Sequence, residues 1–160
     1  MLSVITHSGG QSAQLTGLLS DLVPGAIKGL IRDVLVLEPE VDDPQFIALC
    51  EDAGACRVSG GLDVAVRQAR SDLILLAAPG LRLDAFALDR LGRNLAELGA
   101  GAASKGLALT GPTLPGLGFL ASPRGLVASR RRLLDLPAGT SLEAGLVRAS
   151  RGAPRLAIAG

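Results

Sequence analysis

A single aliphatic run constrains the fold of this chain more than any other stretch. Asp72–Asp84 reads DLILLAAPGLRLD, an unbroken apolar segment that ends at a Pro-Gly pair. A run of this kind is typical of a strand buried on both faces, as at the centre of a mostly parallel sheet. Ligands of such sheets bind beyond the carboxyl ends of the strands. The segment after Leu76 is therefore the expected binding position, yet 77–80 reads AAPG and offers no side chain for chemistry.

Strands and helices alternate along the first half of the chain. Pro24-Gly25 is expected to end the first helix, and Asp43 to cap the second, with Pro44 at its first position. This βαβαβ order predicts an α/β fold, a three-layer sandwich with a mostly parallel central sheet of the Rossmann-like type. The predicted strands cover 2–6, 31–37, 55–58 and 73–77, and the predicted helices cover 12–22, 44–53 and 62–70.

The second half has weaker patterns, and its small residues suggest more irregular structure. We expect Gly99–Lys105 to be a linker and 110–118 to be a Pro/Gly-rich loop. Helices are predicted over 84–98 and 141–150, and short strands over 107–109 and 155–159.

The composition excludes several classes of protein. The 160 residues carry a formal net charge of +1 with acids and bases interspersed, so no nucleic-acid surface is predicted. No apolar segment reaches the roughly 20 residues that a transmembrane helix needs. The first residues carry no targeting signal, and a cytoplasmic protein is expected. Cys50 and Cys56 have the spacing of neither a zinc site nor a disulfide framework.

Several short motifs follow one another along almost the whole chain. The first is the opening SVI, followed by IRDVLVLE at 31–38 and then Asp43. The others are ARSD at 69–72, GLVASRR at 125–131 and LEAGLVR at 142–148. In this order, the motifs resemble those of family 2 glycosyltransferases of the GT-A fold. The resemblance implies one domain over 1–160, in which 1–98 is the nucleotide-binding half and 99–160 is a remnant of the acceptor half.

The resemblance also implies roles for particular residues. Glu38 stands where the family binds the base and ribose of a nucleotide-sugar, and Asp43 falls on the Asp of the family's STD motif, which implies a nucleotide-binding role. Glu143 aligns with the catalytic base. The family's paired acids hold a divalent metal on the diphosphate, but here Ala78-Pro79-Gly80 occupies their place. We therefore expect no metal site and no cofactor. His7 replaces a residue that the family usually has at the end of its first strand.

Each of these residues also has a simpler interpretation. Glu38 lies in an acidic loop, where it can be solvated, and Asp43 before a proline is a typical helix cap. Glu143 falls in a first helical turn, where the helix dipole favours a negative charge. His7 is either a turn residue or a ligand contact. The basic run Arg130-Arg131-Arg132 is either a solvated face or a binding site for a diphosphate or a lipid headgroup.

Two hypotheses of function follow. The missing acids favour a glycosyltransferase-like domain that has lost metal-dependent sugar transfer and acts as a pseudoenzyme, scaffold or interaction module for a protein partner or a second copy. The alternative is an active, metal-independent glycosyltransferase with a nucleotide-sugar donor. In it, Arg130, Arg131 or Arg132 replaces the cation in phosphate binding, and Glu143 is the base.

Overall fold

The computed structural model describes residues 1–8, 12–38, 43–110 and 123–158, and the predicted loop over 110–118 lies outside them from residue 111 on. The strands of this part of the chain are β1 (Leu2–His7), β2 (Ile31–Leu37), β3 (Cys56–Val58), β4 (Leu73–Ala77), β5 (Leu107–Thr110), β6 (Gly125–Ser129) and β7 (Arg155–Ala157). The helices are α1 (Ser12–Ile27), α2 (Pro44–Asp52), α3 (Leu62–Gln68), α4 (Ala85–Lys105), α5 (Arg130–Leu134) and α6 (Leu142–Ala149).

These strands form one sheet in the order β3-β2-β1-β4-β6-β5-β7. The pairs β1–β2, β2–β3, β1–β4 and β5–β7 are parallel, whereas β6 runs antiparallel to both β4 and β5. The prediction of an α/β fold with a mostly parallel central sheet is confirmed. Because β6 is reversed, it begins at the edge of the sheet where β4 ends, and Gly125 pairs with Ala77.

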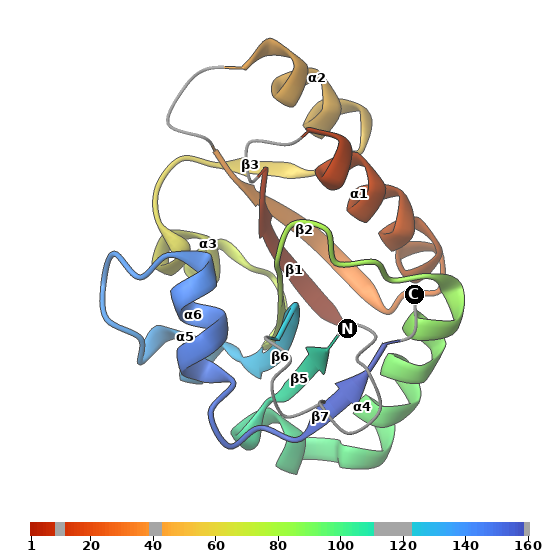
Figure 1. Cartoon of the computed structure of the whole chain (residues 1–160), viewed down its shortest axis with the longest axis vertical. Helices are drawn as coiled ribbons and strands as arrows, with labels where there is room; N and C mark the ends of the chain where they lie inside the picture. The colour runs from red at the N-terminus through yellow and green to blue at the C-terminus, as the bar shows by residue number, and fades with distance from the viewer. Residues whose placement is uncertain (9–11, 39–42, 111–122, 159–160) are drawn as a thin grey trace.

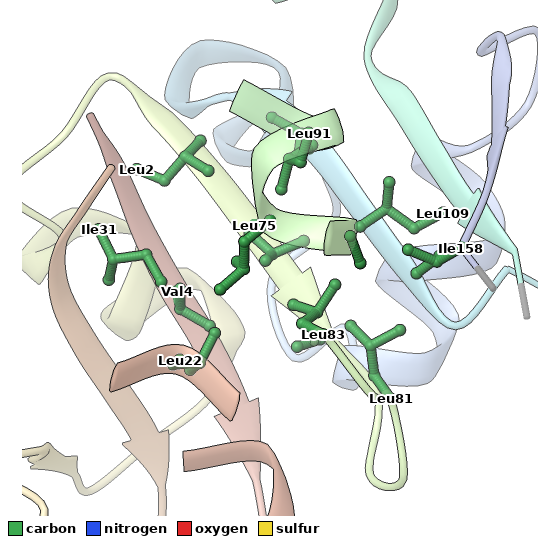
Figure 2. Packing of buried hydrophobic residues seen from close by; sticks show 14 of the residues in the cluster. Leu2, Val4, Leu22, Ile31, Leu75, Leu81, Leu83, Leu91, Leu109 and Ile158 are labelled. Atoms are coloured by element: carbon green, nitrogen blue, oxygen red, sulfur yellow. The ribbon is translucent and has the colours of Figure 1, made fainter. Parts of the chain in front are cut away.

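The sheet is covered on both faces, as Figure 1 shows with α1 and α4 on one side and α3, α5 and α6 on the other. The central strand β4 contributes side chains to the hydrophobic cores on both faces of the sheet. Leu75 packs with α1 and α4, and Figure 2 shows it among Leu22, Leu83 and Leu91. Leu76 packs on the opposite face with α3, α5 and α6. The aliphatic run is therefore buried on both faces, as its sequence predicts.

Helix α1 is longer than its sequence predicts. Pro24 lies inside it, and the helix continues to Ile27, so the prediction that Pro24-Gly25 ends it is wrong. The end comes at Gly29, which has φ +70°, and the Leu30 N–H donates to the Gly25 carbonyl at 2.9 Å. Gly25 lies so close to β2 that a Cβ there would be 2.7 Å from Ile31 Cδ1. Packing of this last turn on the sheet outweighs the cost of the proline.

Helix α4 also departs from the prediction, since Gly99–Lys105 is its last part and not a linker. The alanines of this segment are good helix formers, which offsets its two glycines. Gly106, with φ +75°, ends the helix beside β6. Among the described residues, no helix is both long and apolar enough to cross a membrane.

Candidate functional site

The carboxyl ends of the parallel strands β1, β2 and β4 meet at one edge of the sheet. His7 pairs with Leu37, so Glu38 lies just beyond the end of β2 and beside the end of β1. Helix α6 brings its first turn to the same edge, because its Glu143 contacts His7. This edge is where sheets of this type bind ligands. The structure thus brings together three residues that lie far apart in the sequence, His7, Glu38 and Glu143.

His7 and Glu143 form an ion pair between His7 Nε2 and Glu143 Oε1. The His7 side chain is 23% exposed and that of Glu143 is 59% exposed. Ser141 caps α6 by accepting a hydrogen bond from the Ala144 N–H at 3.2 Å, and this fixes the first turn that carries Glu143. The partly buried imidazole of His7 and the exposed carboxylate of Glu143 therefore meet at the carboxyl ends of the strands.

The Glu143 carboxyl has a pKa below its ordinary value of 4.5. Partial burial acts to raise the pKa, but several neighbours together outweigh it. These are the Glu143 backbone N–H, the charge and hydrogen bond of His7, and the hydroxyl of Ser141. Glu143 is consequently a carboxylate at neutral pH and can accept a proton, although a lowered pKa makes it a weaker base.

Glu38 is held by its neighbours on β3 and the turn after it. Arg57 Nη1 lies 3.4 Å from Glu38 Oε1, and the Ser59 hydroxyl donates to Glu38 Oε2. The Glu38 side chain is 28% exposed, so the carboxylate is fixed but still open to solvent. Its role in binding a base or ribose stays a prediction, and these contacts would orient it for that role.

Asp43 caps α2, as its sequence predicts. Asp43 Oδ1 accepts a hydrogen bond from the Gln45 N–H at 3.0 Å, and Pro44 is the first residue of the helix. One carboxylate oxygen is therefore occupied by the helix. A nucleotide contact by Asp43 remains a prediction, and nothing beyond the cap is needed to explain the residue.

The segment after β4 is a tight turn. The Leu81 N–H donates to the Ala78 carbonyl at 3.1 Å, Pro79 is the second residue of the turn, and Gly80 has φ +76°. This is the pattern of a type II turn. A Cβ on Gly80 would lie 3.4 Å from Oε1 of Gln14 on α1. The turn therefore places a compact, uncharged surface at the centre of the edge.

The described residues of this edge do not fit a divalent cation. Hard cations such as Mg²⁺ require several oxygen ligands, usually carboxylates. In the part of the chain that the structure describes, no three His, Cys, Asp or Glu side chains come close enough together to hold a metal. The turn at Ala78-Pro79-Gly80 supplies no carboxylate where the resemblance places one.

The turn after β4 is anchored to α1 by a second charged pair. Arg82 Nε and Nη2 donate to the two oxygens of Asp21 at 2.7 and 3.1 Å, and the Leu83 N–H donates to Asp21 Oδ2 at 3.0 Å. The Arg82 hydrogen bond is the largest reason why the pKa of Asp21 lies below its ordinary value, and it outweighs partial burial. The end of the turn that leads into α4 is thus fixed to α1.

The basic run lies at the opposite edge of the sheet. Ser129 pairs with Leu73 at the start of β4, so α5 begins there. Arg130 donates to the carbonyls of Ala69 and Ser71, and Arg132 donates to the Ala149 carbonyl at 2.8 Å. Arg131 is exposed on the same short helix. The structure therefore does not bring Arg130 or Arg131 together with His7, Glu38 and Glu143.

Sequence reasoning missed Arg124. Its N–H donates to the Leu109 carbonyl at 2.9 Å, and its carbonyl accepts from the Ala78 N–H at 2.8 Å. Arg124 thus lies at the carboxyl ends of β4 and β5, and its side chain is exposed. The resemblance drew attention to the arginines after β6, whereas the antiparallel direction of β6 puts the residue before it at this edge.

Comparisons with solved structures identify the fold as that of GT-A glycosyltransferases. Glucosyl-3-phosphoglycerate synthase from Mycobacterium tuberculosis, in complex with UDP, matches with a TM-score of 0.70 at 17% identity, over 99% of this chain and 70% of that chain. Staphylococcus aureus TarS 1-349 matches with a TM-score of 0.67 at 17% identity, over 98% of this chain and 57% of that chain. These similarities establish the fold.

Other solved structures match over a similar length at similarly low sequence identity. Mannosyl-3-phosphoglycerate synthase from Rubrobacter xylanophilus matches with a TM-score of 0.63 at 13% identity, over 99% of this chain and 66% of that chain. Structures of the mycobacterial synthase contain Mn²⁺ with UDP-glucose, and one of TarS contains UDP-GlcNAc. No protein-family model matches the sequence, and no curated protein matches it significantly.

Proposed function

We propose that this GT-A domain binds the nucleoside diphosphate part of a nucleotide-sugar at the carboxyl edge of its sheet, without a divalent cation held by carboxylates. The observation that carries the proposal is the contact between His7 and Glu143, which places an exposed carboxylate at that edge. Solved proteins of the same fold hold UDP and UDP-sugars. The turn at Ala78-Pro79-Gly80, which carries no acid, is the reason for leaving the cation out.

Two carboxylates at the edge suit two different groups: Glu38 suits the nucleoside, and Glu143 suits a hydroxyl that attacks the sugar. Glu38, held by Arg57 and Ser59, can accept hydrogen bonds from hydroxyl or N–H groups of a nucleoside. Glu143 is a carboxylate that can accept the proton of an attacking hydroxyl. His7 holds that carboxylate in place. In the transferase form of the proposal, the base is therefore Glu143 and His7 is its positioning residue.

Calorimetric titration of the purified protein with UDP tests the binding. Each titration is run with EDTA and again with Mn²⁺, and GDP and uridine are titrated in parallel. We expect binding of a nucleoside diphosphate in EDTA, with an affinity that Mn²⁺ changes less than about threefold. A need for Mn²⁺ would show that the carboxyl edge holds a cation after all. Absence of binding by UDP, GDP and uridine under both conditions would refute the proposal.

A second candidate function is the pseudoenzyme, scaffold or interaction module. Three large apolar side chains on the helices of one face favour it: Val23 and Ile27 on α1 are 52% and 82% exposed, and Phe86 on α4 is 61% exposed. Lys28 and Asp89 join the two helices beside them at 2.7 Å. Such a surface suits a protein partner or a second copy of the chain.

Turnover separates the two candidates. Release of UDP from UDP-sugars is measured for the wild type and for Glu143→Ala. A transferase predicts release that falls by about 10²-fold or more in the variant, while the circular dichroism spectrum is unchanged. Binding without any release in the wild type would favour the module. Sedimentation of the wild type and of Ile27→Ser with Phe86→Ser would then show whether the apolar surface joins two copies.

A further inference from the structure

The proposed function does not yet name a positive charge that would face the diphosphate. A nucleoside diphosphate carries its negative charge on the phosphates, and in the absence of a metal some protein cation must face it. Glu38 and Glu143, two of the acids described at the carboxyl edge, would repel it. The arginines that the sequence singled out for this task, Arg130 and Arg131, lie at the other edge. The cation must come from elsewhere in the fold.

Most arginines near the carboxyl edge are already engaged. Arg57 pairs with Glu38 at 3.4 Å, Arg67 pairs with Asp63 at 3.8 Å, and Arg82 binds both oxygens of Asp21. Their charge is neutralised locally. Within the described part of the chain, Arg124 is the arginine at this edge whose guanidinium makes no hydrogen bond or ion pair.

The backbone of Arg124 fixes its place next to the missing metal motif. Its carbonyl accepts from the Ala78 N–H at 2.8 Å, so Arg124 lies directly beside the first residue of the turn that replaces the acids. The strands β1, β4 and β6 are neighbours in the sheet. Neighbouring strands lie about 5 Å apart, so roughly 10 Å separates the backbone of Arg124 from that of His7 at the end of β1. A diphosphate is short enough to lie between two groups at this spacing.

We propose that Arg124 binds the diphosphate of the nucleotide, and that its guanidinium supplies the positive charge which a divalent cation supplies in other proteins of this fold. This inference rests on the proposed function. An arginine matches phosphate oxygens with two parallel N–H donors and is charged at every physiological pH. It would bind the ground state of the donor and stabilise the charge that develops on a leaving diphosphate.

Calorimetry on two ligands tests the proposal. UDP and uridine are titrated in EDTA into the wild type, Arg124→Ala and Arg124→Lys. The matched control is Arg93→Ala, because Arg93 is exposed on α4 and has no side-chain partner in the part of the chain described. We expect Arg124→Ala to lose about 10- to 100-fold in affinity for UDP, with uridine affinity unchanged within about twofold. Arg124→Lys should recover part of the loss, and Arg93→Ala should match the wild type.

Each outcome separates this inference from the proposed function. Equal affinity of Arg124→Ala and the wild type for UDP would overturn the role of Arg124 while the binding function stands. Equal loss for UDP and uridine would also overturn it, because the residue would then act on the nucleoside or on the fold. A wild type that binds UDP no better than uridine would show that no cation faces the phosphates. Lack of binding by both ligands in the wild type would remove the proposed function itself, and the inference with it.

Discussion

His7 and Glu143 form an ion pair that joins the end of the first strand to the start of the last described helix. The pair links the two halves of the chain at the edge where a ligand would bind. It also holds Glu143 in the first turn of α6. The hydroxyl of Ser141, which caps this helix, accepts a hydrogen bond from the Ala144 N–H. The position of the Glu143 carboxylate thus depends on a side chain from the opposite end of the sequence, His7.

Glu143→Gln should make the protein slightly less stable at neutral pH. The lowered pKa of Glu143 means that its charge stabilises the fold above about pH 4.5, and that this contribution is lost as the pH falls through the lowered value. We expect the melting temperature to drop by about 1–3 °C at pH 7 and to equal that of the wild type near pH 2. Scanning calorimetry from pH 2 to pH 8 measures the difference, with Glu51→Gln as an exposed control. A difference that grows toward acid pH would contradict the assignment.

Asp21→Ala should have a larger effect of the same sign. The variant loses two hydrogen bonds from Arg82 and one from the Leu83 N–H. Because the pKa of Asp21 is lowered, its stabilisation is present above about pH 4 and disappears as the pH falls further. The melting temperature at pH 7 should fall by about 2–4 °C. Asp89→Ala breaks the exposed pair with Lys28 and should change it by less than about 1 °C, so equal effects of the two variants would refute the prediction.

Leu75→Ala should destabilise the protein strongly. Leu75 is fully buried in the central strand and packs against α1 and α4, so its truncation leaves a cavity. The free energy of unfolding should fall by about 2–5 kcal/mol. Urea denaturation followed by circular dichroism measures it. Val147→Ala, at a side chain that is 52% exposed, should cost less than about 0.5 kcal/mol.

Two glycine substitutions in helices should act in opposite directions. A Cβ on Gly145 of α6 would lie 2.7 Å from Leu62 Cδ2, whereas nothing lies within 4 Å of a Cβ on Gly17 of α1. Gly17→Ala should therefore stabilise the fold by about 0.5–1 kcal/mol through helix propensity alone. Gly145→Ala should lose that gain and about 1–3 kcal/mol more to crowding between α6 and α3. Urea midpoints of the two variants would show it, and a shift of both in the stabilising direction would mean that Leu62 moves aside without cost.

The fold was largely predictable because burial leaves a pattern in the sequence. The run at Leu73–Ala77 is a strand with the predicted bounds, and Asp43 with Pro44 starts α2 as predicted. The extent of α1 and α4 was not predictable in the same way. Pro24 and the glycines of 99–105 are local signals for a helix end, and tertiary packing and the alanines around them override these signals.

The site was less predictable than the fold. The contact between His7 and Glu143 depends on how α6 docks on the sheet, and no local pattern encodes that docking. The direction of a short apolar strand such as GLVAS is also absent from its sequence. The expectation for Arg130 and Arg131 rested on the affinity of arginine for phosphate. The antiparallel pairing of β6 separates both residues from the carboxyl edge and brings Arg124 there. The roles of Glu38 and Asp43 in nucleotide binding stay predictions.

The turn after β4 bears on how readily a metal site could be rebuilt in this protein. Substituting acids for Ala78 and Gly80 would put carboxylates back into the sequence, but the backbone of this turn opposes the change. Gly80 has φ +76°, where a side chain costs about 1–2 kcal/mol, and its Cβ would approach Gln14 on α1. Asp21 and Arg82 hold the rest of the turn in place. An engineer who wished to add Mn²⁺ dependence would have to replace the whole loop, because its main-chain path, and not only its side chains, opposes added carboxylates.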